Sequence, residues 1–131
     1  MKVRVYKNLH KDCYSVKAME GLQKGRVIYH ASSIQLSDVN FKVYEKGREK
    51  VLKEKMKNVH AFVEGNLESI HLHSGFTTDY PFVKSLEKID TVQKISYNPY
   101  SHGFFYNVSD DTPIENASMV VLNSHGVWSI Q

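Results

Sequence analysis

The chain has 131 residues, with 17 lysines and arginines against 14 aspartates and glutamates, and a formal net charge of +3. This length is typical of one soluble domain, 1–131, and no apolar run approaches the roughly 18 residues that a membrane span needs. The single cysteine excludes an internal disulfide, so we expect a protein of the reducing cytoplasm.

The first third of the chain predicts strands. Val3 and Val5 alternate with polar residues, which is the period of a strand with one buried face. The turn residues Ser37 and Asp38 separate two later strand-like segments. We expect four strands here, over 3–6, 13–18, 26–31 and 39–43.

Residues 47–58 predict the clearest helix. Val51, Leu52 and Met56 cluster on one side and are expected to pack against the core. Asn58 is a residue type that readily adopts the left-handed conformation that ends a helix. Four lysines recur at i, i+4, i+7 and i+11 and form a stripe on the opposite side: Lys46, Lys50, Lys53 and Lys57.

The remainder of the chain is expected to return to strands, with a second short helix at about 80–89. Gly65 separates two strand segments, and the Asn/Gly-containing connections near the C-terminus predict two hairpins. The expected strands are 59–64, 67–72, 92–97, 104–108, 118–122 and 127–130. The sequence therefore predicts a β-rich α+β domain made of antiparallel hairpins, with one basic amphipathic helix at about 47–58.

Positive charge is concentrated in residues 42–57. This stretch holds seven of the 17 cationic residues and three glutamates, a local charge of +4, and no lysine or arginine follows Lys94. Such a face usually meets an anionic partner, although a lysine-rich helix is often only a solvated surface. We interpret the following residues as candidate ligands for phosphate: Lys46, Arg48, Lys50, Lys53, Lys57 and Asn58.

His60 directly follows the cationic helix. Its side chain titrates near neutrality, so it is a candidate catalytic acid or base for phosphodiester cleavage, with Lys57 stabilising the developing charge. The alternative is a half-exposed histidine on an ordinary strand. His71 and His73 share one side of a predicted strand, but no third ligand completes a zinc signature, and we predict neither a metal nor a cofactor.

Aromatic side chains are dense in residues 97–106. Exposed rings in a turn can stack on bases, which makes Tyr97, Tyr100 and His102 candidate ligand contacts. The alternative is that these rings belong to the core and tie the turn together. The segment carries no positive charge, so it suits a small nucleotide pocket or a protein partner better than a continuous nucleic-acid groove.

Several strings of the sequence resemble small uncharacterised proteins of phage and prophage genomes. The likeness covers most of the chain and is carried by Tyr6-Lys7-Asn8-Leu9, Asp12-Cys13-Tyr14-Ser15, Gly47-Arg48, Lys57 to Val63 and Tyr97-Asn98-Pro99-Tyr100. It attaches no activity to any residue. It implies a cytoplasmic protein of an infected or lysogenic bacterium, either a nucleic-acid-handling factor or a binder that blocks a host enzyme or sequesters its signal.

Our leading hypothesis is therefore a domain that binds a phosphate-bearing ligand, nucleic acid or a nucleotide, through the lysine-rich helix. The alternative is a protein-interaction module that inhibits a host defence enzyme or sequesters its signal. A metal-independent, ribonuclease-like enzyme is the third hypothesis. Oligomeric state and strand order are not predicted by the sequence.

Overall fold

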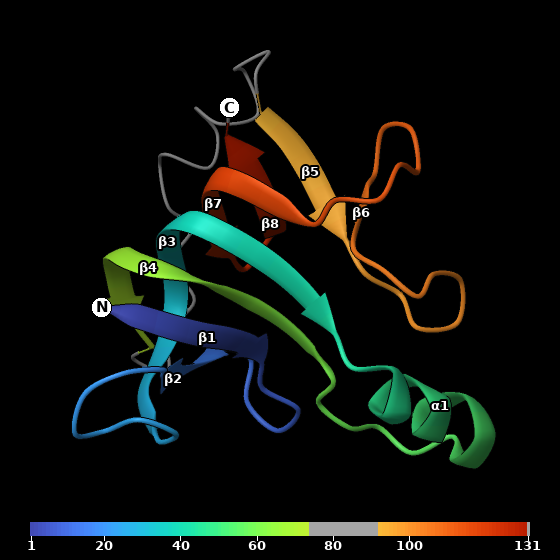
Figure 1. The fold of residues 1–131 in the computed structure, drawn as a ribbon, viewed down its shortest axis with the longest axis horizontal. Helices are drawn as coiled ribbons and strands as arrows, with labels where there is room; N and C mark the ends of the chain where they lie inside the picture. Colours follow the sequence, from blue (N-terminus) through green and yellow to red (C-terminus); the bar gives the residue numbers. More distant parts are fainter. Residues whose placement is uncertain (74–91, 131) are drawn as a thin grey trace.

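A computed structural model of the protein describes residues 1–73 and 92–130. Eight antiparallel strands form one sheet in the order β2-β1-β4-β3-β7-β8-β5-β6, and the helix α1 (Glu45–Glu54) extends beyond it (Figure 1). The strands are β1 Lys2–Lys7, β2 Tyr14–Ala18, β3 Val27–Val43, β4 Ala61–Leu72, β5 Val92–Ser96, β6 Tyr106–Asn107, β7 Asn116–Asn123 and β8 Gly126–Ile130.

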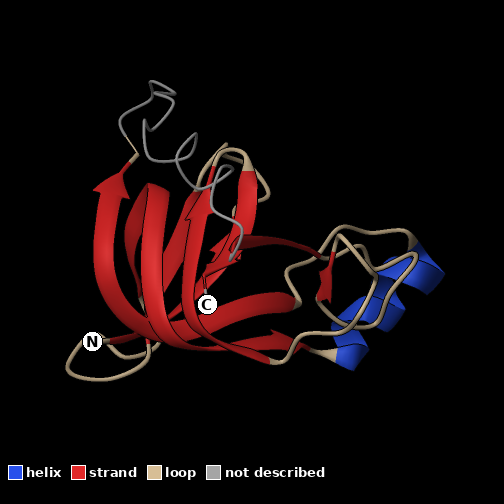
Figure 2. Cartoon of the chain, turned by 90° about the horizontal axis from the view of Figure 1, so that it is seen from above, coloured by secondary structure: helices blue, strands red, loops and turns tan. Residues whose placement is uncertain are grey.

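The sheet curls on itself, as Figure 2 shows. Strand β2 pairs with both β1 and β3, and β4 also pairs with both, so these four strands form a closed ring of pairings. The Tyr14 hydroxyl donates a hydrogen bond of 2.9 Å to the Asn123 carbonyl and joins the β1–β2 hairpin to the β7–β8 turn. The inner face carries the apolar core, which includes Val3, Val5, Val16, Ile34, Leu36, Ile95, Val120 and Leu122.

Several sequence predictions are confirmed in this sheet. Val3 and Val5 are fully buried, and β7 and β8 form the expected hairpin around residues 124–125. The other C-terminal hairpin is shorter than expected, because β6 is only two residues long and most of 97–105 is a loop. The second helix predicted at 80–89 lies outside the described residues.

The prediction of separate strands on either side of Ser37-Asp38 is wrong. Strand β3 continues for 17 residues, because β4 pairs with one edge while β2 and then β7 pair with the other. Asp38 adopts a positive φ of 48° in a bulge inside the strand. Likewise β4 passes through Gly65, where a Cβ atom would lie 2.8 Å from the Ser37 carbonyl oxygen, so a glycine is needed there.

The helix prediction needs two corrections. The helix begins at Glu45 and ends before Asn58, because Lys55 takes the left-handed conformation, with φ at 54° and its N–H bonded to the Val51 carbonyl. Leu52 and Met56 do not pack against the core as predicted and are 38% and 62% exposed. The helix projects past the sheet (Figure 2), and among its residues Val51 is the buried one.

Within the described ranges, no helix combines the length and the apolar character that crossing a bilayer requires.

Candidate functional site

The first turn of α1 is packed directly on the segment that enters β4. A Cβ atom at Gly47 would lie only 2.4 Å from the Cβ atom of His60, so the glycine permits this close approach. The Asn58 side-chain amide donates to the Gly47 carbonyl at 3.0 Å. The Tyr44 N–H donates to the His60 carbonyl at 2.8 Å. These contacts fix the angle at which the helix leaves the sheet.

His60 is buried, with 6% of its surface exposed, rather than half-exposed on a strand. The Asn58 carbonyl, 3.1 Å from Nδ1, can only accept, so Nδ1 carries a proton. In the neutral ring Nε2 then accepts the hydrogen bond of the Tyr97 hydroxyl at 2.6 Å. A substrate reaches Nε2 only after Tyr97 is displaced, so this geometry does not favour the proton-transfer role predicted for His60.

Arg48 also serves the docking of the helix in this structure. Its Nε donates to the Pro99 carbonyl at 3.1 Å and its Nη1 lies 3.2 Å from Glu45 Oε1. The guanidinium faces Gly103, where a Cβ atom would lie 3.4 Å from Nη1. Arg48 thus holds the helix against the 97–103 turn. Asn58 ties Gly47 of the helix to the segment before β4, and Tyr97 bonds to His60 of that segment. From the sequence we expected these residues to contact a ligand, and in the structure they have partners within the protein.

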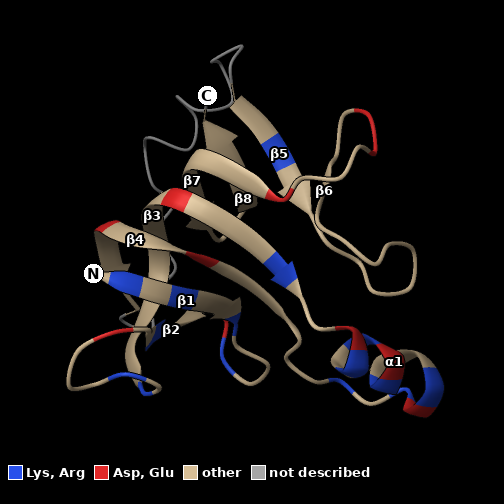
Figure 3. Cartoon of the chain, in the orientation of Figure 1, with Lys and Arg blue, Asp and Glu red and all other residues tan. Residues whose placement is uncertain are grey.

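The remaining lysines of the helix point to solvent. Lys46, Lys50 and Lys53 on α1 and Lys57 after it are exposed. Basic and acidic residues alternate on this projecting end, as Figure 3 shows. Lys42, by contrast, lies 3.1 Å from the buried carboxylate of Glu64 and is committed to that ion pair. Fewer cationic side chains are therefore available to a ligand than the net charge of residues 42–57 suggests.

A cleft of about 390 Å³ lies at the base of the helix. It brings together three segments that are distant in sequence: the end of β1, the junction between α1 and β4, and the 97–100 turn. Lys7 and Lys57 border an otherwise largely aromatic and apolar wall. The residues that line it are Tyr6, Lys7, Leu9, Val51, Lys57, Asn58, Val59, His60, Ala61, Tyr97, Pro99 and Tyr100.

A second cavity, of about 440 Å³, adjoins the cleft. It lies between the β1–β2 hairpin and strands β5, β7 and β8, with core side chains at its floor. Lys94, Ser96, Ser124 and His125 are the polar residues found in its lining and not in that of the cleft. Four residues line both hollows and form their shared wall: Tyr6, Lys7, Ala61 and Tyr97.

The aromatic segment 97–106 divides between core and surface. Tyr97 packs on the buried Phe105, with ring centroids 5.3 Å apart, and burial raises the pKa of Tyr97 to about 12. Tyr100 is 66% exposed at the mouth of the cleft. Phe104 is also partly exposed, at 41%. Phe105 is therefore part of the core with Tyr97 packed against it, whereas Tyr100 and Phe104 lie at the surface.

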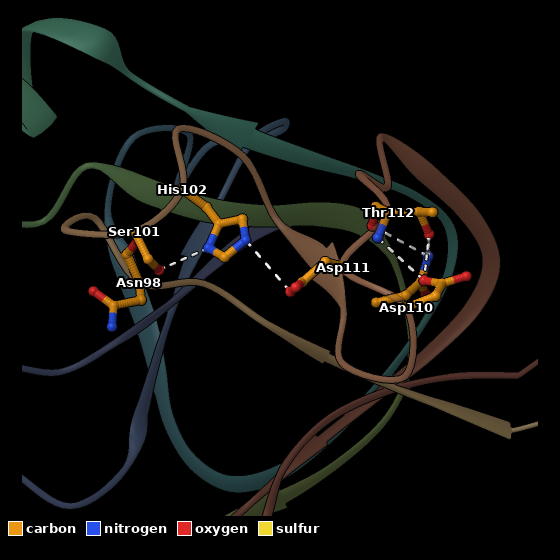
Figure 4. Close-up of polar contacts among 7 residues, drawn as sticks. Asn98, Ser101, His102, Asp110, Asp111 and Thr112 are labelled. Atoms are coloured by element: carbon orange, nitrogen blue, oxygen red, sulfur yellow. Dashed lines mark hydrogen bonds and ion pairs between the residues drawn. The ribbon is translucent and has the colours of Figure 1, made fainter.

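His102 lies outside both hollows, although the sequence made it a candidate ligand contact. Its ring stacks on Tyr106 at 3.9 Å. Its Nδ1 is 2.6 Å from Ser101 Oγ and its Nε2 is 3.5 Å from Asp111 Oδ1 (Figure 4). The order of groups is that of a serine–histidine–aspartate relay, yet Ser101 and Asp111 are exposed and line neither hollow. We interpret these contacts as bracing the turn.

Sequence reasoning missed three residues of this site. Tyr6 and Lys7 were noted only within a strand prediction and a string that resembles phage proteins, and neither they nor Lys94 were predicted as ligand contacts. Lys94 was noted only as the last cation of the chain. Their role depends on which strands the sheet brings together. In the described part of the chain, no three His, Cys, Asp or Glu side chains are grouped to hold a metal ion.

The curled antiparallel sheet and its projecting helix define a small, mostly β protein of the α+β class. The family described as Mycobacterium phage L5 gene 82 protein matches residues 1–130. The gene 82 protein of Mycobacterium phage L5 is 37% identical over 133 residues, covering 97% of this chain and 94% of that protein. The chain therefore belongs to this phage protein family. No solved structure matches it.

Proposed function

We propose that this phage protein binds a phosphate-bearing ligand, a nucleotide or nucleic acid, in the cleft at the base of α1. The observation that carries the proposal is the composition of the cleft, in which Lys7 and Lys57 stand beside the rings of Tyr6 and Tyr100. Ammonium groups suit phosphates, and aromatic rings suit the faces of bases. Both requirements of a nucleotide are present within one hollow.

The position of the cleft adds an electrostatic argument. Lys46, Lys50 and Lys53 are exposed on the helix above it. Residues 45–57 hold six lysines and arginines against three glutamates, a net charge of +3 beside the cleft, which favours the approach of an anionic ligand. A longer nucleic acid would follow these lysines, whereas a mononucleotide would need only the cleft.

The same end of the molecule supports the alternative, a protein-interaction module that inhibits a host defence enzyme or sequesters its signal. Leu52, Met56, Tyr100 and Phe104 are all at least 38% exposed. Exposed apolar and aromatic side chains of this kind are common in protein interfaces. Salt separates the two functions, because affinity that rests on phosphate contacts falls steeply with ionic strength.

The test is a titration of the purified protein with mononucleotides and short single-stranded RNA and DNA, each at a low and a higher salt concentration. Lys57→Glu should weaken binding about tenfold or more, because it places a negative charge at the cleft. Lys24→Glu is the matched control, since Lys24 is an exposed lysine in the β2–β3 loop. No binding of any of these ligands by the wild type at low salt would refute the proposal.

A double change, Lys50→Glu with Lys53→Glu, extends this experiment to the helix. It should weaken binding of the oligonucleotides and leave mononucleotides nearly unaffected, because both residues lie outside the cleft lining. Equal losses for both ligand classes would show that the helix, and not the cleft, is the primary contact.

A further inference from the structure

The cleft and the second cavity are neighbours and share part of their walls. The cleft at the base of α1 and the cavity beside β5 are similar in size, at about 390 and 440 Å³. Tyr6, Lys7, Ala61 and Tyr97 belong to the linings of both. A ligand bound in one hollow therefore lies next to the other hollow, and Lys7 belongs to the wall between them.

Cationic residues are distributed over this pair in a regular way. Lys57 lines only the cleft, Lys94 lines only the cavity, and Lys7 lines both. Lys7 lies 3.0 Å from Asp12, but both side chains are mostly exposed, so this pair is weak and can exchange for a phosphate. Each hollow thus has one lysine of its own, and both share Lys7.

Each hollow also offers rings to a planar group. Tyr100 lies in the cleft lining and Phe105 in the cavity lining, and the shared wall adds Tyr6 and Tyr97. A nucleobase is flat and largely apolar on its faces, which is the shape such walls accept. One hollow is of the size that takes one nucleoside, and two adjoining hollows take two.

We propose that the site binds two nucleotides joined by a phosphodiester, one base in each hollow, with the linking phosphate at Lys7 and the flanking phosphates at Lys57 and Lys94. This inference rests on the proposed function and specifies its ligand. The shared chemistry is a dinucleotide unit, which is either a free dinucleotide or a step within a single strand.

The experiment compares three probes by isothermal titration calorimetry. They are a dinucleotide phosphorylated at both ends (pNpNp), a mononucleoside 3′,5′-bisphosphate (pNp) and inorganic tripolyphosphate, which has the same number of phosphates as pNpNp but no bases. We expect pNpNp to bind one per chain and at least tenfold more tightly than pNp, because linking two units makes the second contact intramolecular. We expect tripolyphosphate to bind at least tenfold more weakly than pNpNp.

Two variants address the cavity separately from the cleft. Lys94→Glu should weaken pNpNp about tenfold, and Ser124→Trp, which fills the cavity from the β7–β8 turn, should reduce pNpNp to the affinity of pNp. Lys24→Glu is again the control for charge, and a urea unfolding curve of each variant confirms that it is folded. If a single-stranded octanucleotide binds as tightly as pNpNp, the ligand is a dinucleotide step within a strand. If the octanucleotide binds more weakly, the ligand is a free dinucleotide.

Failure of the two-nucleotide site can be distinguished from failure of the proposed function. If pNpNp binds no more tightly than pNp, or if tripolyphosphate equals pNpNp, the two-nucleotide site is wrong while the proposed function stands on its own evidence. If folded Lys94→Glu and Ser124→Trp both bind pNpNp like the wild type, the cavity is not part of the site. If no probe binds at low salt, the proposed function is refuted as well.

Discussion

A buried ion pair links the neighbouring strands β1 and β4, and its loss has a measurable cost. Glu64 on β4 is 2% exposed, and the Arg4 Nε on the neighbouring strand β1 donates to its Oε1 at 2.6 Å. Lys42 lies 3.1 Å from the other carboxylate oxygen. The Arg4 guanidinium also lies over the Phe62 ring at 4.7 Å. Arg4→Ala removes the principal partner of a charge that has almost no access to water.

The structure allows the cost to be bounded. Removing one partner of a buried ion pair costs about 3–5 kcal/mol, because the other charge stays buried and unpaired. Lys42 remains, though its side chain is 51% exposed and compensates only in part. We therefore expect Arg4→Ala to lower the free energy of unfolding by about 3 kcal/mol. Lys7→Ala is the matched control on the same strand, since the Lys7–Asp12 pair is 53% and 71% exposed, and should cost less than about 1 kcal/mol.

The assay is urea unfolding at pH 7 and at several lower pH values. Burial by itself raises the pKa of Glu64, but the hydrogen bonds and charges of Arg4 and Lys42 outweigh it and hold the pKa below its usual value of 4.5. The stabilisation is thus complete above that value and is lost as the pH falls through the lower pKa of the folded state. The difference between wild type and Arg4→Ala should shrink over this range. An equal cost for Arg4→Ala and Lys7→Ala, or a difference independent of pH, would refute this reasoning.

Two further predictions concern the docking of α1. Gly47→Ala should destabilise the protein, because the new Cβ would lie 2.4 Å from the Cβ atom of His60. Helix propensity alone predicts the opposite, since alanine is favoured over glycine in a helix by roughly 1 kcal/mol. A raised melting temperature would contradict the close packing. Burial raises the pKa of Tyr97 from 10.0 to about 12. Because the folded state favours the neutral phenol, Tyr97 contributes stability that is present below pH 10 and is lost as the pH rises towards 12. Tyr97→Phe should therefore flatten the alkaline decline in unfolding free energy and remove one tyrosine that ionises near pH 12 from the ultraviolet titration. Loss of a tyrosine that ionises near pH 10 instead would show that Tyr97 is accessible to water.

Local patterns in the sequence determined much of the secondary structure. The alternation at Val3 and Val5 predicted a strand, and both side chains are fully buried. The connection at residues 123–126 predicted the β7–β8 hairpin, and the lysine-rich segment predicted a helix that exists. These features follow from interactions between residues close in sequence, which is why period and turn chemistry were sufficient.

Other features depended on partners that are distant in the chain. A turn at Ser37-Asp38 was a sound local prediction, but β3 runs through it because strands pair with both of its edges. Leu52 looked like a core residue from its spacing and is 38% exposed, because none of the described elements covers that side of the helix. Local periodicity indicates which residues share a face, and only packing decides which face is covered.

For the candidate site as well, the sequence indicated individual residues, and only the structure showed which of them lie together. The sequence identified Lys57 and Tyr100 as separate features and had no means of joining them. The sheet order places the end of β1, the junction after α1 and the 97–100 turn around one cleft, and adds Tyr6 and Lys7 to it. Residue type and local spacing indicate what chemistry a side chain offers. Which side chains act together was decided by the tertiary structure, because contacts between segments dozens of residues apart arise only when the sheet forms and its core is buried.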